Sequence, residues 1–216
     1  IKYTKTLFKL FNEKNITEDT LMISIDGIAP QAKMVQQRSR RFRSVLQKKE
    51  TQKIDDQFNI PPKKNTWDRN AITPGTLFMY NLSKVLTRTL KNDKFFKQIK
   101  YRIISDASVP GEGEHKIVSY LRDTRDMGND DRDDYATIIY GLDADLTMLA
   151  MATKYKNIYL LREAVHFGKV QEDEFRFLDI PEFKTGLYNE LIECLDESFL
   201  PNIDKDLIIQ DYIFLC

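Results

Sequence analysis

The chain has 216 residues, with 33 basic and 33 acidic side chains and a formal net charge of zero. That length fits one domain or a large part of one, and 42% hydrophobic residues are enough for a substantial core. Two cysteines exclude a disulfide framework, and no apolar run approaches the roughly 20 residues that span a bilayer, so we expect an intracellular protein with no membrane partner.

The charges are segregated along the chain. From Lys33 to Lys49 there are seven basic residues and no acidic one, whereas acids outnumber bases in residues 123–134. Local fields can therefore be strong although the total charge cancels, and nucleic acid is not excluded as a partner.

Strands and helices alternate through most of the chain. Short apolar runs predict strands at 21–25, 100–105, 136–140 and 157–162. Helical spacing predicts helices at 30–50, within 73–90, and at 113–126, 144–153, 182–196 and 204–216, and the polar residues 51–73 predict a loop. This alternation predicts an α/β fold with a mostly parallel central sheet flanked by helices.

Five carboxylates lie where predicted strands give way to turns or helices: Asp26, Glu112, Glu114, Asp143 and Asp145. The carboxyl ends of parallel strands share one edge of a sheet, so we expect all five acids at that edge. Clustered carboxylates repel one another unless a cation lies between them, and oxygen ligands suit Mg²⁺ or Mn²⁺. Each motif taken alone is explained equally well by a turn or a helix N-terminus, but together they predict a metal site for phosphodiester chemistry.

A second candidate site lies on the helix predicted at 30–50. Lys33, Gln37, Arg40 and Arg41 have spacings of four, seven and eight, so they share one helix face. Guanidinium and ammonium groups bind phosphate well, and this stripe suits a terminal phosphate. The alternative is a solvated charged face, which is disfavoured because no acid stands four residues away to pair with these cations.

Other side chains are given structural roles. The adjoining helix face, which holds Met34, Val35, Phe42, Val45 and Leu46, is expected to pack on the domain. We expect Arg38 to form an ion pair, Trp67 to anchor its loop, and Asp106 to hold the loop that follows strand 100–105.

Five sequence blocks, in order, resemble the XRN-type 5′→3′ exoribonucleases: IDGIAPQAKMVQQRSRRFRS, WDRNAITPGTLFM, SDASVPGEGEHKIVSYLR, YGLDADLTMLAMAT and LLREAVHFG. The resemblance covers about residues 21–168 and continues more weakly to Cys216. It implies a PIN-like fold of the 5′-nuclease type. It also implies that residues 1–216 are part of one nuclease domain, with a core at about 21–168 and a mainly helical extension at 172–216.

The same resemblance implies an activity, its ligands and its partners. Such enzymes remove nucleotides one at a time from single-stranded RNA with a 5′-monophosphate, in RNA decay or processing. The five acids would bind two catalytic Mg²⁺ or Mn²⁺ ions, and Lys33, Gln37, Arg40 and Arg41 would receive the 5′-phosphate. Protein partners would come from RNA decay or transcription termination.

The resemblance also implies two further catalytic acids outside these residues, so we expect the chain to be an internal piece of a longer catalytic region. Two alternatives stay open: a flap-type structure-specific endonuclease, and a non-catalytic scaffold that binds RNA 5′ ends. Cytoplasmic and nuclear residence both stay open, because SDAS resembles nuclear members and LLREAVHFG resembles cytoplasmic ones.

Overall fold

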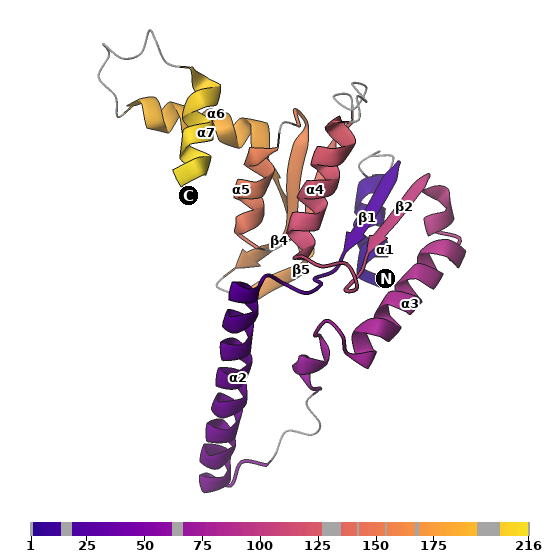
Figure 1. The fold of residues 1–216 in the computed structure, drawn as a ribbon, viewed down its shortest axis with the longest axis vertical. Helices are drawn as coiled ribbons and strands as arrows, with labels where there is room; N and C mark the ends of the chain where they lie inside the picture. The colour runs from indigo at the N-terminus through magenta and orange to yellow at the C-terminus, as the bar shows by residue number, and fades with distance from the viewer. Residues whose placement is uncertain are drawn as a thin grey trace. The chain divides into compact units, whose positions relative to one another are not determined.

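The structure is a computed structural model that describes residues 2–13, 19–61, 67–126, 135–141, 143–153, 155–166, 169–193 and 204–215 (Figure 1). The chain divides into two compact units, Ile1–Lys116 and Ile117–Cys216, and each is described by itself. No helix among the described residues is long and apolar enough to cross a membrane.

The first unit pairs two strands in parallel and surrounds them with helices. Its elements are α1 (Lys2–Glu13), β1 (Thr20–Ser24), α2 (Gln31–Gln57), η1 (Arg69–Ala71), α3 (Leu77–Asn92), η2 (Phe96–Gln98), β2 (Tyr101–Ser105) and the start of α4 (Gly113–Asp126). Thr20 lies opposite Tyr101 and Ser24 lies opposite Ser105, so β1 and β2 end side by side. Below these strands, Phe8, Leu90, Phe96 and Ile99 form a buried cluster.

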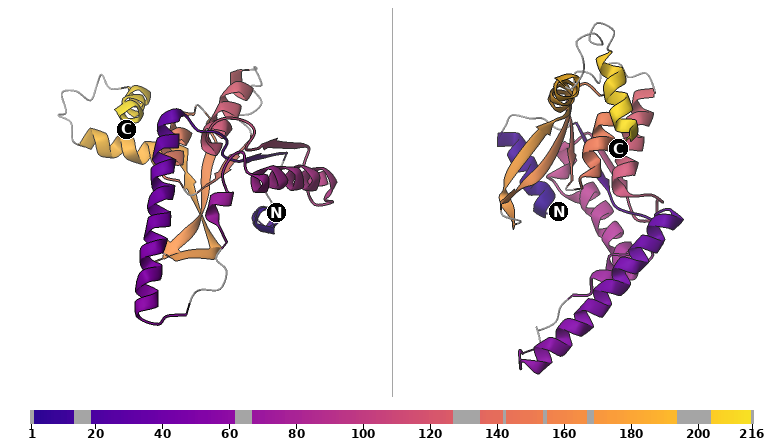
Figure 2. Two further views of the ribbon diagram at one scale, coloured as in Figure 1. Left: turned by 60° about the horizontal axis from the view of Figure 1, so that its bottom comes forward. Right: turned by 90° about the vertical axis from the view of Figure 1, so that its left-hand side faces the viewer.

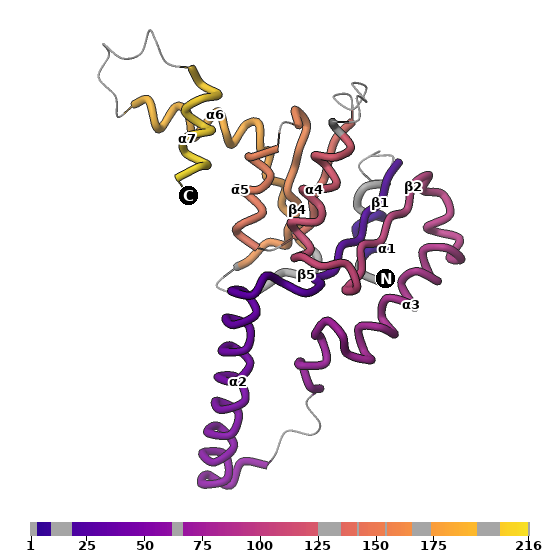
Figure 3. Tube along the Cα trace, in the orientation of Figure 1, coloured from indigo at the N-terminus to yellow at the C-terminus, as the bar shows by residue number. Residues whose placement is uncertain are grey.

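The long helix α2 is uninterrupted in every view (Figures 2 and 3). It begins after Pro30, and its many Gln, Arg, Lys and Glu residues are good helix formers. The helix runs on to Gln57, so the loop predicted to begin at residue 51 begins later.

The apolar face of α2 does not pack as expected. None of the helix residues is buried, and Phe42, for example, is 73% exposed. The expectation that Met34, Val35, Phe42, Val45 and Leu46 pack on the domain is therefore wrong for the part of the chain that the structure describes. The physical reason is that Phe42 and Val45 face a hollow rather than a packed core.

The second unit is built on a three-stranded sheet. Its elements are the rest of α4, then β3 (Thr137–Tyr140), α5 (Asp145–Ala152), β4 (Ile158–His166), β5 (Lys169–Asp179), α6 (Ile180–Glu193) and α7 (Lys205–Leu215). The strand order is β3-β4-β5, with β3 and β4 parallel and β4 and β5 antiparallel. The buried cluster of this unit draws on the sheet and on α4 to α7, and includes Leu121, Ile139, Met151, Ile180 and Ile209.

The α/β prediction is confirmed, but the sheet differs from the prediction. The described strands form a two-stranded parallel sheet and a three-stranded mixed sheet, rather than one mostly parallel sheet. The extension predicted at 172–216 begins with the end of β5, which continues to Asp179, and its other described elements are the helices α6 and α7. Phe175 and Phe177 alternate with Glu174 and Arg176, which is the pattern of a half-solvated antiparallel strand.

Candidate active site

The carboxylate of Asp26 lies at the start of α4. β1 and β2 continue their pairing past their ends, since the Ile25 amide donates to the Ser105 carbonyl at 2.9 Å. One residue on, Asp26 Oδ1 accepts a 2.6 Å hydrogen bond from the amide of Gly113, the first residue of α4. A carboxylate in this position stabilises a helix N-terminus, and here it ties the end of β1 to the turn that carries Glu112 and Glu114.

Two glycines allow the backbones to meet at this turn. The Gly27 amide donates to the Gly111 carbonyl and the Gly111 amide donates to the Ile28 carbonyl, each at 2.9 Å. A Cβ atom on Gly27 would lie 1.9 Å from the Val109 carbonyl oxygen, so no larger residue fits. Gly111 has a φ of 105°, which L side chains rarely adopt.

A buried lysine holds the same turn from below. Lys116 is 9% exposed, and its Nζ donates to the carbonyls of Ile25 at 2.8 Å and Asp106 at 2.9 Å. Burial lowers the pKa of Lys116, and the nearby carboxylates of Asp106 and Asp26 oppose that shift. Of the five candidate acids, Asp26 is the one whose charge acts on the Lys116 pKa within the described part of the chain.

Asp106 holds the loop after β2, as the sequence predicts. Its carboxylate accepts hydrogen bonds from the Ser108 amide at 3.0 Å, from the Ser108 hydroxyl at 2.5 Å, and from the Ser83 hydroxyl of α3. These bonds hold the pKa of Asp106 below its usual value. Within the described part of the chain, the hydrogen-bond donors to Asp106 are two serines, one in this loop and one in α3.

Glu112 contacts a cation from a distant part of the chain. Its Oε2 lies 3.0 Å from Lys33 Nζ, and the two side chains are 18% and 36% exposed respectively. The partner of Lys33 is therefore an acid that lies far away in the sequence, and not a neighbour on α2. Glu114, in the first turn of α4, is half-buried.

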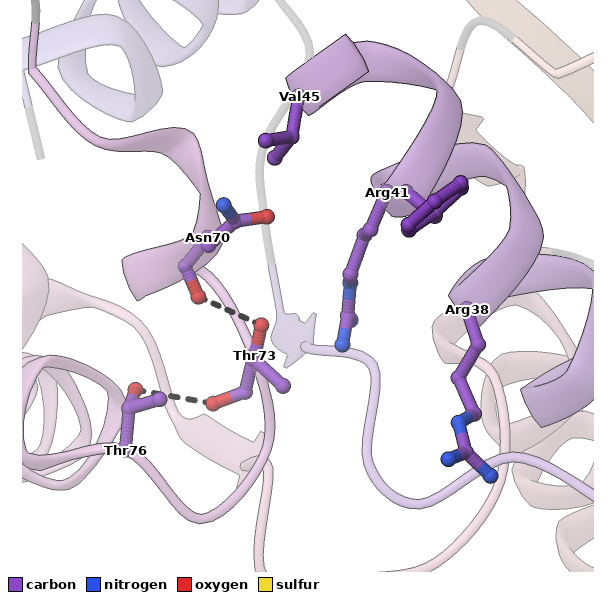
Figure 4. Close-up of a pocket in the computed structure, with 7 residues that line it drawn as sticks. Arg38, Arg41, Val45, Asn70, Thr73 and Thr76 are labelled. Carbon is purple, nitrogen blue, oxygen red and sulfur yellow. Dashed lines mark hydrogen bonds between the residues drawn. The ribbon is translucent and has the colours of Figure 1, made fainter.

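The phosphate-binding candidates lie on the first turns of α2. Lys33, Gln37 and Arg41 are half-buried, whereas Arg40 is exposed. Arg41 also lines a hollow of about 610 Å³ together with Arg38, Phe42 and Val45 of the same helix (Figure 4). We find no ion pair of Arg38 within the described residues, so its expected partner is not seen; its guanidinium lies at the hollow instead.

The opposite wall of the hollow is a hydrogen-bonded loop that contains Asn70, Thr73 and Thr76. The Thr73 hydroxyl donates to the Asn70 carbonyl at 2.6 Å, and the Thr76 hydroxyl donates to the Thr73 carbonyl at 2.9 Å (Figure 4). Trp67 contacts Phe78 edge-on, with ring centroids 5.3 Å apart, but both side chains are exposed, so Trp67 contacts α3 and does not anchor the loop to the core as expected. The loop is thus tied to the first turns of α3.

The remaining two acids belong to the second unit. Asp143 follows β3, and Asp145 opens α5; both side chains are exposed. The N-cap residue of α5 is Ala144, and no side chain caps this helix. The helix-N-terminus alternative therefore holds for Asp145, which lies in the first turn of α5, whereas Asp143 does not cap this helix. The metal-binding role of both acids stays a prediction.

The chemistry of the donors fits a hard divalent cation. Asp26, Glu112 and Glu114 supply carboxylate oxygens at one turn, and Glu112 already lies against a positive charge. Among the residues that the structure describes, however, no group of three or more His, Cys, Asp or Glu side chains is placed to hold one ion. The convergence of all five acids stays a prediction.

Comparison with known proteins assigns the family. The N-terminal region of the XRN 5′-3′ exonucleases matches residues 1–164. The chain belongs to this family. It is 36% identical to the 5′-3′ exoribonuclease 2 of Schizosaccharomyces pombe, over 99% of this chain and 25% of that protein. The resemblance inferred from the five sequence blocks is confirmed.

Two further XRN relatives cover the chain almost completely. The 5′-3′ exoribonuclease 2 of Arabidopsis thaliana is 41% identical over 99% of this chain and 25% of that protein. The 5′-3′ exoribonuclease 1 of Saccharomyces cerevisiae is 36% identical over 99% of this chain and 14% of that protein. The chain spans a quarter or less of the length of these relatives, and all nine candidate residues lie inside the XRN match.

Sequence reasoning missed two features of the candidate site: the buried Lys116 and the contact of Lys33 with Glu112. The sequence held a weak indication that Lys116 is buried. Lys116 directly precedes the apolar pair Ile117 and Val118, which marks the buried side of α4. The contact between Lys33 and Glu112 left no local signal, because it joins two segments that are distant in the chain.

Proposed function

We propose that this chain is part of a 5′→3′ exoribonuclease that hydrolyses 5′-monophosphorylated RNA one nucleotide at a time. The proposal is carried by a single observation. Lys33 belongs to the stripe that suits a phosphate, and Glu112 is one of the acids that suit a metal. Lys33 Nζ lies 3.0 Å from Glu112 Oε2. A terminal phosphate held by this stripe would therefore lie close to hydrolytic acids. The names of the XRN relatives support the same activity.

The proposed fold is PIN-like, with the two small sheets contributing to one nuclease domain. This rests on the XRN match and on the strand–helix alternation of both units. The domain would be completed by parts of the protein outside these residues.

The proposed site would hold two ions, Mg²⁺ or Mn²⁺, through Asp26, Glu112, Glu114, Asp143 and Asp145. When bound, such ions activate a water molecule and stabilise the leaving oxygen of an in-line displacement. Asp26 is oriented for this task by the Gly113 amide, and Lys116 balances the negative charge from behind.

Lys33, Gln37, Arg40 and Arg41 would hold the 5′-phosphate. A guanidinium can donate two parallel hydrogen bonds to phosphate oxygens, and an ammonium adds a compact charge. Holding the terminal phosphate sets the distance to the first phosphodiester bond, so that cleavage releases one nucleotide. The walls of such a site also exclude a capped or triphosphorylated end by size.

The test compares RNA ends in the full-length protein with Mg²⁺ or Mn²⁺ present. We expect mononucleotides to be released from 5′-monophosphate RNA much faster than from 5′-hydroxyl RNA. Arg41→Ala should reduce that preference by about ten- to a hundredfold, because it removes a charge-assisted hydrogen bond to phosphate. Arg88→Ala, which removes an exposed arginine from α3, is the matched control and should leave the preference unchanged.

Equal rates on both RNA ends in the unmodified protein would overturn the proposal. Cutting within the strand of a flap or bubble substrate would instead favour a structure-specific endonuclease. Tight binding of 5′-monophosphate RNA without any cleavage would favour a non-catalytic scaffold.

A further inference from the structure

One ion pair joins residues that the proposed function assigns to two different ligands. Lys33 is proposed to bind the phosphate and Glu112 to bind the metal. Lys33 Nζ lies 3.0 Å from Glu112 Oε2. The Glu112 side chain is only 18% exposed, so the pair is partly shielded from water. Both residues belong to the unit Ile1–Lys116.

Each ligand competes with this ion pair. A divalent ion that binds Glu112 takes over the carboxylate oxygen that Lys33 contacts. A phosphate that binds Lys33 draws the ammonium away from Glu112, because its charge exceeds that of a single carboxylate. A metal ion at Glu112 therefore frees Lys33 to bind phosphate, and a phosphate at Lys33 frees Glu112 to bind the metal ion.

Neighbouring contacts hold the two partners in place for this exchange. The Gly27 and Gly111 amides pair residues 27–28 with the loop that precedes Glu112. α2 begins shortly after residues 27–28, and Lys33 lies in its first turns. The Glu112 carbonyl accepts the Lys116 amide at 3.1 Å, so the backbone of Glu112 belongs to the start of α4. Only the two side chains need to move.

We propose that Lys33 makes metal binding at Glu112 depend on the 5′-phosphate of the RNA. Without an RNA end, Lys33 occupies Glu112 and weakens metal binding. With a 5′-phosphate, Lys33 turns to the phosphate and Glu112 becomes available to the metal. Lys33 is thus a specificity-determining residue that acts through Glu112, and this inference rests on the proposed function.

The coupling is reciprocal. If a 5′-phosphate tightens metal binding by some factor, the metal tightens phosphate binding by the same factor. A partly exposed ion pair supports a factor of about two to five. A 5′-monophosphate end would then raise the rate of the chemical step as well as RNA affinity.

The test measures Mn²⁺ binding to the full-length protein by electron paramagnetic resonance of the free ion. In the unmodified protein, saturating adenosine 5′-monophosphate should tighten Mn²⁺ binding by about two- to fivefold, and adenosine should not. In Lys33→Met, Mn²⁺ binding without nucleotide should already be tighter by that factor, and the nucleotide should add no further gain. Lys48→Met removes an exposed lysine from the same helix, and its Mn²⁺ affinity should match that of the unmodified protein.

Two results would overturn the inference. One is that Lys33→Met has the same Mn²⁺ affinity as the unmodified protein. The other is that adenosine 5′-monophosphate does not change the Mn²⁺ affinity of the unmodified protein. If either occurred while 5′-monophosphate RNA was still degraded preferentially, the proposed function would stand and only the coupling would fall. If no preference for 5′-monophosphate RNA were found, the proposed function would fall first and the coupling with it.

Discussion

At the scale of single residues, the candidate acids are placed by neighbours that carry no catalytic chemistry. The Gly27 amide donates to the Gly111 carbonyl and the Gly111 amide donates to the Ile28 carbonyl. Lys116 donates to the carbonyls of the residues that directly follow the two strands. Asp26 is held by a backbone amide rather than by another side chain. The geometry of this turn therefore depends on backbone contacts that tolerate very little change.

Gly27→Ala tests this dependence. The new Cβ would lie 1.9 Å from the Val109 carbonyl oxygen, which is a backbone atom and cannot turn aside. We expect the segments to separate and the amides of Gly111 and residue 27 to lose protection from hydrogen exchange. Overpacking of this kind costs about 1–3 kcal/mol of stability. Hydrogen exchange followed by mass spectrometry of peptides from both segments measures the effect.

Gly186→Ala is the matched control. Gly186 lies in α6, and a Cβ there meets no atom within 4 Å. Alanine in a helix is favoured over glycine by about 1 kcal/mol, so this variant should keep or gain protection. Unchanged exchange of the Gly111 amide in Gly27→Ala would show that the turn is looser than the structure indicates.

At the scale of helices and strands, the sequence predicted the elements whose bounds depend on local propensity and capping. The helix at 113–126 was predicted with the same bounds as α4, because glycine, an acidic first turn and apolar spacing coincide there. α2 runs beyond its predicted end because residues 51–57 contain good helix formers and no glycine or proline. The strand β5 was missed because charged residues dominate it, and only its antiparallel pairing with β4 makes it a strand.

For the candidate site, only the placement of some residues can be compared with the sequence, and the roles of those residues stay predictions. The positions of Asp26, Glu112 and Glu114 at one turn follow from strand order, which the sequence shows. The ion pair between Lys33 and Glu112 does not, because it is a long-range contact between two side chains. The exposed apolar face of α2 was also unpredictable, since periodicity marks a face as apolar without saying what covers it.

The loop that faces α2 across the hollow depends on one hydroxyl. Thr76 Oγ1 accepts the Met79 amide at 3.3 Å, as the N-cap of α3. Its one hydrogen is shared between the Ala71 carbonyl at 2.6 Å and the Thr73 carbonyl at 2.9 Å. Thr76→Ala should lower the free energy of unfolding by about 1 kcal/mol, measured by urea denaturation. Thr76→Ser keeps the hydroxyl and should restore most of that loss.

Thr89→Ala is the control for this prediction within the same helix. Its hydroxyl only bonds back to the Val85 carbonyl at 2.8 Å, in the last turns of α3. Such a bond adds little to helix stability, so this variant should unfold like the unmodified protein. Equal losses in Thr76→Ala and Thr89→Ala would count against the capping role of Thr76.

At the scale of the whole molecule, the five candidate acids are divided between the two units. Asp26, Glu112 and Glu114 belong to residues 1–116, whereas Asp143 and Asp145 belong to residues 117–216. The XRN match runs from residue 1 to residue 164 and so spans both. The proposed 5′-phosphate stripe, by contrast, lies in the first unit alone.

Asp143→Ala in the full-length protein should separate these two functions. Removing a residue that only hydrogen-bonds a metal ligand typically lowers activity about ten- to a hundredfold. Asp143→Ala removes a proposed ligand itself, so activity should fall more than about a hundredfold. RNA binding, measured by fluorescence anisotropy, should persist because the stripe on α2 is intact. Asp123→Ala removes an exposed acid of α4 and should leave both unchanged. Full activity of Asp143→Ala in excess Mg²⁺ and Mn²⁺ would contradict the ligand assignment.

The paired backbones of residues 25–28 and 105–111 have a consequence for how this region can evolve. Ile25 bonds to Ser105, Gly27 to Gly111, and Gly111 to Ile28, so the segment between β2 and α4 is tied at both of its ends. An inserted or deleted residue there would break these bonds and shift Glu112 away from its place. The number of residues in this segment is therefore constrained by the backbone pairing at both of its ends.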